Sequence, residues 1–220
     1  MNALTVAAEN GNTTCLQLSL DSKANINSAN RYGSTATMDA ANLGHTTCLQ
    51  MLSDARADIN VRNKYGATAL ILASSQGNTS CLQLLLDAKA DIDVTNKDGA
   101  TAAIWASSEG LTACLRMLLE AKANIGLGNH KGNTALMYAA GNGHTQCLQL
   151  LLDAKAEVDE YRINHRQPYA GDNLKARIYL KGEEPSSRSF ILWHSSSDMN
   201  RRTVWYPPCY SHPPRTGGTG

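Results

Sequence analysis

Five of the six cysteines stand at one fixed interval, and this regularity constrains the fold more than any other feature of the chain. They are Cys15, Cys48, Cys81, Cys114 and Cys147, each 33 residues from the next. Two series of glycines and one of leucines keep the same interval: Gly33 to Gly132, Gly11 to Gly143, and Leu16 to Leu148. A period of roughly 20–50 residues indicates a solenoid, in which each repeat is one small structural unit stacked on its neighbours.

The pattern within one unit, residues 64–96, predicts a turn, two short helices and an extended arm. Gly66 suits the turn because glycine tolerates a positive φ angle, and Thr68 suits the N-cap of the first helix. Gly77 is expected to end that helix in the left-handed conformation, and Asn78 is expected to open the second helix. Apolar residues then recur at helical spacing. They are Cys81, Leu82, Leu84 and Leu85.

The segments "GATALILA", "GNTALMYA" and "GSTATMDA" resemble the ankyrin signature G-x-T-P-L-H-x-A, and "NGHTQCLQLLLDAKAEVD" resembles its second-helix half. The resemblance covers residues 1 to about 161. It implies an all-α ankyrin-repeat solenoid, built from helix-turn-helix repeats with β-hairpin-like turns. The five expected repeats are residues 1–30, 31–63, 64–96, 97–129 and 130–161.

The chain departs from the signature at regular positions. The signature proline is replaced by alanine in every unit, and the glycine after the second helix is replaced by Lys or Arg. The basic residues are Lys23, Arg56, Lys89, Lys122 and Lys155. We expect the fold to be kept, at a cost of about 1 kcal/mol wherever such a residue must be left-handed.

A C-terminal tail, residues 162–220, differs in composition from the repeats, and the sequence leaves its structure poorly defined. Residues 1–161 hold 11 Lys and Arg against 15 Asp and Glu (−4), whereas the tail holds 9 against 4 (+5) and all six prolines. Three alternatives stay open. The tail is a disordered basic segment, or it packs on the last repeat through Phe190, Trp193 or Trp205, or it is non-native sequence from a mispredicted gene end.

The cysteine series is predicted to belong to the core. Equivalent atoms in stacked helices lie about 10 Å apart, whereas a disulfide needs Cα atoms within roughly 7 Å. The sequence has no CxxC or HxxxH spacing, which a zinc site of the common kinds would need. A buried free cysteine behaves as a small hydrophobic residue, and a thiol-rich body favours a reducing compartment.

No catalytic motif is recognisable in the sequence. The nucleophile elbow, Walker, HExxH and kinase signatures are all missing, and His45 and His144 stand where we expect them to cap a second helix. We therefore expect no enzyme activity, no cofactor, no metal and no small-molecule substrate. Without a signal peptide or an apolar run of about 18 residues, we expect no membrane insertion and no secretion. The expected location is the cytoplasm, with the nucleus as an alternative.

The resemblance implies a protein-binding scaffold or adaptor, since partners of this family usually dock on the concave face formed by turn tips and first helices. Positions that vary between repeats are not fixed by stacking, and they are the candidate contacts. They are Arg31, Tyr32, Leu43, Lys64, Tyr65, Gln76, Lys97, Asp98, Glu109, His130 and Lys131. Tyr32 and Tyr65 are the strongest candidates, because tyrosine is a common interface anchor. The alternative is that each tyrosine packs over the neighbouring repeat. Nucleic-acid binding is not expected of the repeats and would have to rest on the basic tail.

An alternative function is regulatory. The array would then be the recruiting or regulatory portion of a larger polypeptide whose effector or enzyme domain is absent from this chain. The first unit enters directly at its helix and carries the apolar residues of an inner repeat. Because terminal repeats need a polar outer face, either an apolar edge is exposed or this chain is a fragment of a longer array.

One series in the first helices has mixed chemistry. Val6, Leu72, Trp105 and Tyr138 occupy equivalent positions, which we expect to pack against the core, with the concave surface as the alternative for Trp105 and Tyr138. Asp39 stands in the same series and breaks its apolar character. The sequence gives no reason for this aspartate.

Overall fold

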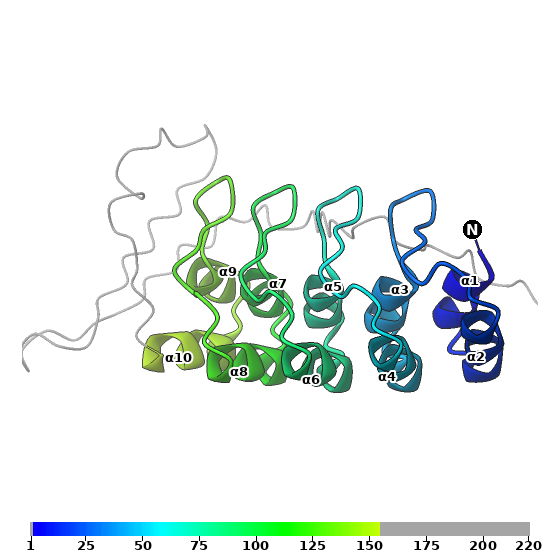
Figure 1. Cartoon of the computed structure of the whole chain (residues 1–220). Coiled ribbons are helices and arrows are strands. Elements are labelled where there is room, and N and C mark those ends of the chain that lie inside the picture. Colours follow the sequence, from blue (N-terminus) through cyan, green and yellow to red (C-terminus); the bar gives the residue numbers. More distant parts are fainter. Residues whose placement is uncertain (1, 155–220) are drawn as a thin grey trace, which may run out of the picture. The chain divides into compact units, whose positions relative to one another are not determined.

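The computed structural model describes residues 2–154, which fold into five pairs of α-helices (Figure 1). The first helices of the pairs are α1 (Ala3–Glu9), α3 (Ala36–Leu43), α5 (Ala69–Gln76), α7 (Ala102–Ser108) and α9 (Ala135–Gly141). The second helices are α2 (Thr13–Asp21), α4 (Thr46–Asp54), α6 (Thr79–Asp87), α8 (Thr112–Glu120) and α10 (Thr145–Asp153). The predicted all-α solenoid is confirmed. The predicted boundary at residue 161 and the tail from 162 lie outside the described residues.

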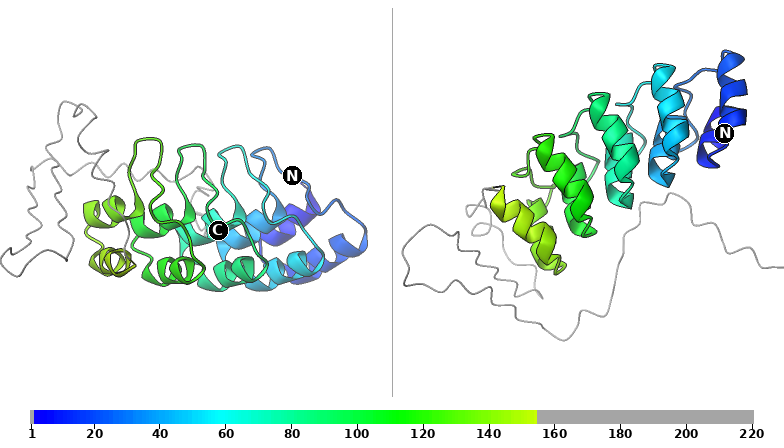
Figure 2. Two further views of the ribbon diagram at one scale, coloured as in Figure 1. Left: turned by 60° about the vertical axis from the view of Figure 1, so that its left-hand side comes forward. Right: turned by 90° about the horizontal axis from the view of Figure 1, so that it is seen from below.

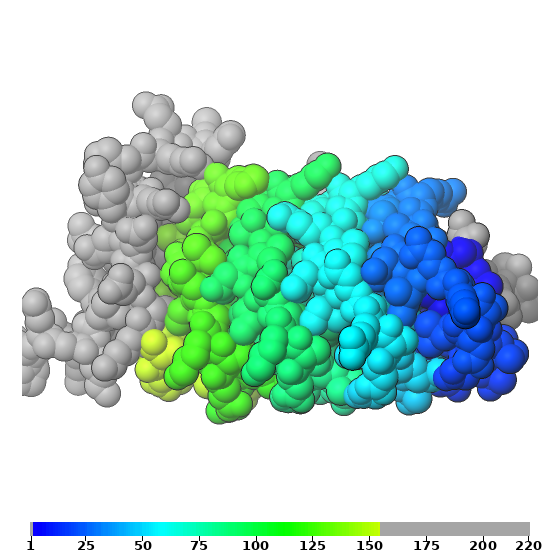
Figure 3. Space-filling model, viewed as in Figure 1, coloured from blue at the N-terminus to red at the C-terminus, as the bar shows by residue number. Residues whose placement is uncertain are grey.

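The helices form two rows, because each first helix packs against the next first helix and each second helix against the next second helix. In Figure 1 the turn tips project beyond the row of first helices, on the side away from the second helices, and Figure 2 shows the tips side by side. One antiparallel β-bridge, between Gly128 and Thr134, accompanies these hairpin-like turns within residues 2–154. Figure 3 shows the successive repeats as closely packed bands. None of the helices in the described part is long and apolar enough to span a bilayer.

The boundaries of the first helices follow from residues that the sequence repeats. The side-chain oxygens of Thr68, Thr101 and Thr134 accept a hydrogen bond from the main-chain N–H three residues later, at 3.4, 3.3 and 3.4 Å. Each threonine therefore satisfies one of the donors that a helix start leaves unpaired. Gly44 and Gly77 end α3 and α5 with φ angles of 76° and 77°, as predicted.

The core lies between the two rows and combines small residues with large ones. One alanine in each first helix is at most 4% exposed, which lets the first helices approach closely: Ala7, Ala40, Ala73, Ala106 and Ala139. Leucines of the second helices fill the remaining space and are at most 1% exposed: Leu16, Leu49, Leu82 and Leu115. Each fully buried leucine contributes about 1.5–3 kcal/mol from the removal of apolar surface from water.

The basic residues that replace the family glycine are left-handed, as the sequence analysis anticipated. The φ angles are 57° at Lys23, 61° at Arg56, 61° at Lys89 and 67° at Lys122. A side chain with a β-carbon is strained in this conformation, where glycine is not. At these four positions the backbone therefore has the left-handed conformation that suits glycine, although the residue is Lys or Arg.

Two sequence predictions need correction. Cys48, Cys81, Cys114 and Cys147 are buried as expected, but Cys15 is exposed, because no earlier repeat in the described part covers its helix. The second concerns the two histidines, which do not cap their own helices. Their rings point instead to main-chain carbonyl groups of the preceding repeat.

Candidate protein-binding surface

Each turn tip is built around one asparagine that the sequence analysis did not single out. The Oδ1 atom of Asn63 accepts hydrogen bonds from the main-chain N–H groups of Tyr65 (2.9 Å) and Ala67 (3.0 Å). The same pair of bonds recurs in the other tips. The asparagines are Asn30, Asn63, Asn96 and Asn129. Their 33-residue interval was the signal that could have identified them.

The tips are also bonded to one another through the main chain. The N–H of Lys64 donates to the carbonyl oxygen of Tyr32 at 2.9 Å, and the N–H of Lys97 donates to that of Tyr65 at 2.8 Å. His130 donates in the same way to Asp98 at 2.9 Å. These bonds hold neighbouring tips in a fixed row. The side chains of the tip residues therefore lie along one edge of the repeat array.

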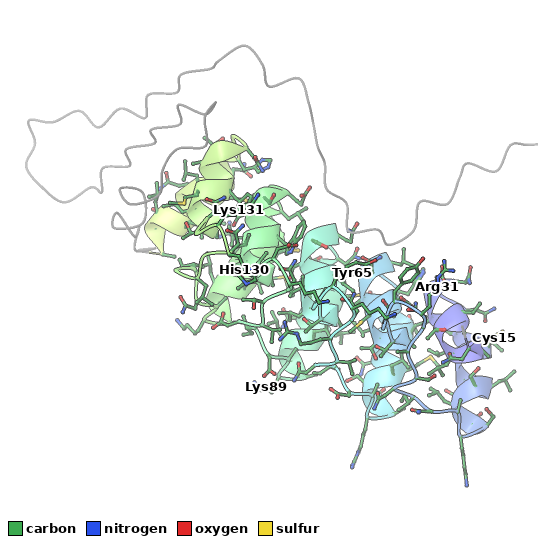
Figure 4. The ribbon with its side chains drawn as sticks, turned by 90° about the horizontal axis from the view of Figure 1, so that it is seen from above. Cys15, Arg31, Tyr65, Lys89, His130 and Lys131 are labelled. Carbon is green, nitrogen blue, oxygen red and sulfur yellow. The ribbon has the colours of Figure 1, made fainter. Side chains whose placement is uncertain are left out.

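The side chains predicted for the tips lie together along this row. Six of them are exposed: Arg31, Lys64, Lys97, Asp98, His130 and Lys131. Tyr32 and Tyr65 are half-buried, and the Arg31 guanidinium carbon lies 4.7 Å from the centre of the Tyr32 ring, within cation–π distance. Figure 4 shows Arg31, Tyr65, His130 and Lys131 spread along the array.

The other three predicted residues form a separate row at the far ends of the first helices. Leu43 and Gln76 are the last residues of α3 and α5, and Glu109 follows α7 directly. All three are exposed, and Leu43 is 44% exposed. Helices of seven or eight residues are about 11 Å long, so the structure places the candidates in two parallel rows and not in one cluster.

The helix surface between the rows carries the series that contains Asp39. Asp39 is 5% exposed, and its Oδ2 atom has no hydrogen-bond partner. Burial, and secondarily the charge of Glu9, raises the pKa of Asp39 to about 7. Trp105 and Tyr138 are half-buried. The Tyr138 hydroxyl accepts a hydrogen bond from Asn129 Nδ2 at 2.9 Å, whereas the buried Nε1 of Trp105 has no partner.

The far ends of the first helices are held by side chains from the following repeat. The Nε2 atom of His45 lies 3.0 Å from the carbonyl oxygen of Glu9, and that of His144 lies 2.9 Å from the carbonyl oxygen of Ser108. The Nδ2 atom of Asn78 donates to the carbonyl oxygen of Ala41 at 2.9 Å. These contacts hold the ends of α1, α3 and α7, and with them the positions of Leu43 and Glu109.

Burial also governs the chemistry of the cysteines in the second, third and fourth repeats. Burial raises the pKa of the Cys48, Cys81 and Cys114 thiols, and a protonated thiol is a poor nucleophile and a poor metal ligand. Within residues 2–154, no group of three or more His, Cys, Asp or Glu side chains is placed to hold a metal ion.

Comparison with known families agrees with the geometry. A family model of ankyrin repeats (many copies) matches residues 38–86, and a model of ankyrin repeats (3 copies) matches residues 70–164. No curated protein matches the chain. Ankyrin repeats are in general protein–protein interaction modules. Because the two matches together span residues 38–164, more than half of the 220 residues, the chain belongs to the ankyrin repeat family.

Proposed function

We propose that this protein is a scaffold or adaptor that binds a protein partner across the surface formed by the turn tips and the far ends of the first helices. The observation that carries the proposal is a contrast between backbone and side chains. The tip backbone is the same in each repeat, whereas the exposed side chains on it differ: Arg31-Tyr32, Lys64-Tyr65, Lys97-Asp98 and His130-Lys131. A fixed support with varied side chains is what selective binding needs.

The charge and size of the tip side chains favour a partner with an acidic contact surface. Arg31, Lys64, Lys97 and Lys131 place positive charge on successive tips, and Asp98 is the acidic exception. Complementary charge raises the association rate and helps to exclude wrong partners. Tyr32 and Tyr65 add large, half-exposed rings, which contribute most to affinity when a partner covers them.

Affinity capture with the full chain as bait tests this proposal. One bait carries the natural sequence, and a second carries Tyr32→Ala, Lys64→Ala, Tyr65→Ala and Lys97→Ala. A matched control replaces four exposed residues at one equivalent position of the second helices: Gln17, Gln50, Gln83 and Arg116 are each changed to Ala. All three baits are first compared by circular dichroism for equal helix content.

The proposal expects partners that the natural chain and the control capture but the tip variant does not. A partner that the tip variant retains and the control loses would move the site to the second helices and overturn the proposal. Adding salt should reduce capture, because contacts between exposed charges are screened.

A further inference from the structure

One position of the turn tip carries a basic side chain in each of four repeats. The four residues, which we call the tip row, are Arg31, Lys64, Lys97 and His130, and all of them are exposed. The residue after this position varies in chemistry: it is Tyr32, Tyr65, Asp98 or Lys131. The N–H groups of Lys64, Lys97 and His130 donate to carbonyl groups of the preceding tip at 2.8–2.9 Å. The side chains of the tip row therefore start from fixed and equivalent points along the array.

Positive charge is concentrated at the tips. The described residues 2–154 hold ten Lys and Arg against twelve Asp and Glu (−2). The four tips, residues 28–34, 61–67, 94–100 and 127–133, hold five against one (+4), which leaves five against eleven (−6) for the rest of the described chain. Arg62 contributes to the tip charge, and its Nε atom donates to the carbonyl oxygen of Gly66 in the same tip at 3.3 Å. The tips are thus a positive edge on an otherwise negative part of the chain.

Another basic series of the same period provides a contrast. It stands just after the second helices and consists of Lys23, Arg56, Lys89 and Lys122. Each member has an acidic residue two positions earlier, as Asp87 precedes Lys89. In the tip row only Lys97 has an acidic residue within two positions, which is Asp98. The charge of the tip row is therefore the less compensated of the two, and it attracts an anionic partner more strongly.

The spacing of the tip row favours one conformation of such a partner. The first helices pack directly on one another, and packed helices lie about 8–10 Å apart, so we expect successive tips to repeat at about this distance. A polyproline II helix has about three residues per turn, so every third side chain points the same way at intervals of about 9 Å. Side chains on one face of a β-strand are only about 7 Å apart. An α-helix needs about seven residues to return to one face at a comparable spacing.

Two tyrosines beside the tip row decide between the extended and the helical segment. Tyr32 follows Arg31 directly, and Tyr65 follows Lys64. Both side chains are half-buried, so part of each ring is open to a partner. The Arg31 guanidinium carbon lies 4.7 Å from the centre of the Tyr32 ring, which places a charge and an aromatic surface side by side. Aromatic surfaces are what proline-rich segments in the polyproline II conformation dock on.

We propose that the tip row binds an acidic, proline-containing segment of a partner protein in the polyproline II conformation, with Asp or Glu at every third residue. Successive carboxylates pair with Arg31, Lys64 and Lys97, and the residues between them pack on Tyr32 and Tyr65. A segment of about ten residues spans the row, and its extended conformation exists before binding, so little conformational entropy is lost. This inference rests on the proposed function, because it names the kind of partner that the same surface binds.

Fluorescence polarisation with labelled peptides and the full-length protein tests the period and the conformation. The probe is a peptide with four repeats of Glu-Pro-Pro. One control has the same composition with its Glu residues in one block, and a second has four repeats of Glu-Gly-Gly. We expect both controls to bind about fivefold more weakly, because exposed ion pairs are individually weak and the controls lose either the match of charges or the proline contacts.

Substitutions test the site itself. Arg31→Ala combined with Lys64→Ala should weaken binding of the Glu-Pro-Pro peptide about fivefold. The matched control, Arg56→Ala combined with Lys89→Ala, removes the same charge from exposed residues of the other series and should leave binding unchanged. Asp98→Tyr gives the fourth tip the Lys-Tyr pair of the third and should strengthen binding about threefold, since it removes a repulsive carboxylate and adds a ring. Loss of folding does not produce such a gain.

Two results would overturn this inference: equal binding of the three peptides, or an equal loss of binding in the two double variants. Either result leaves the proposed function standing if the tip variant still loses partners in affinity capture. Unchanged capture by the tip variant would instead contradict the proposed function. The two failures are therefore distinguishable.

Discussion

The Nε2 atom of His45 lies 3.0 Å from the carbonyl oxygen of Glu9 and joins the second repeat to the end of the first helix of the first repeat. Because a carbonyl oxygen only accepts, Nε2 must carry the ring proton. Asn78 meets the same requirement at the next junction, where its Nδ2 atom donates to the carbonyl oxygens of Ala41 and Asn42 at 2.9 and 2.8 Å. Two residue types therefore perform one role in holding repeats together.

This relationship predicts that His45→Ala lowers the free energy of unfolding by about 1–2 kcal/mol, because a part-buried carbonyl group loses its donor. His45→Asn should lose much less, since Asn78 shows that an amide can make the contact. Urea denaturation followed by circular dichroism measures both variants. If alanine and asparagine were equally damaging, the hydrogen bond would not be the source of the stability.

Asp39 predicts an unusual pH dependence. The pKa of this carboxyl group is about 7 in the folded chain, against 3.8 as its ordinary value. The folded state therefore holds a proton that the unfolded state has released, and stability falls as pH rises through the window from about 4 to 7. Each unit of pKa difference corresponds to about 1.4 kcal/mol, so the loss at pH 8 is on the order of a few kcal/mol.

Asp39→Leu isolates this effect, because the equivalent Leu72 is accommodated at 4% exposure. We expect the variant to be more stable than the natural chain at pH 8 and to lose much of that advantage at pH 4, where Asp39 is protonated and only the cost of a buried uncharged polar group remains. Asp39→Asn removes the charge but keeps a buried polar group, so it should give a smaller gain at pH 8. Thermal melts of the three proteins at both pH values measure the difference. Parallel pH profiles for the natural chain and Asp39→Leu would show that Asp39 does not titrate in this range.

The tip asparagines predict a coupled loss of stability and binding. Asn63→Ala leaves the main-chain N–H groups of Tyr65 and Ala67 without their acceptor. The loss costs about 1–3 kcal/mol at the buried Ala67 N–H and less at the part-buried Tyr65 N–H. Asn63→Asp keeps an acceptor oxygen for both donors and should be milder. Denaturation gives the stability change. Capture of a partner should weaken in Asn63→Ala, because Lys64 and Tyr65 lose their fixed backbone, and unchanged capture would argue against a tip site.

The repeat length, the helix pairs and the buried cysteines could be predicted from the sequence because they recur at one interval. Thr68 and Gly77 form the start and the end of their own helix, so their roles could also be predicted from the local sequence. The roles of His45 and Asn78 were not, since their partners are main-chain carbonyl groups of another repeat and leave no pattern of residue types. Asp39 was visible as an exception, but its burial depends on neighbouring helices and not on its own segment.

The candidate surface was predicted less completely than the fold. Variation between repeats identified the exposed tip residues, and the structure places them in one row. Leu43, Gln76 and Glu109 stand at the far ends of the predicted first helices, apart from the tips, but how far the two rows lie from each other depends on the length and direction of those helices. Cys15 was assigned to the core from its repeat position alone. Burial there requires a preceding repeat, which a local pattern does not supply.

Lys89 predicts that the chain gains stability when the family glycine is restored. Its φ angle of 61° places a residue with a β-carbon in the strained left-handed region, and its side chain is exposed, so little packing is lost on truncation. Lys89→Gly should therefore raise the free energy of unfolding by about 1 kcal/mol. Lys89→Ala is the control, because it removes the same charge and length but keeps the β-carbon, and it should give no gain. Urea denaturation of the two variants compares them directly, and an equal gain in both would assign the effect to the lysine charge and not to the backbone.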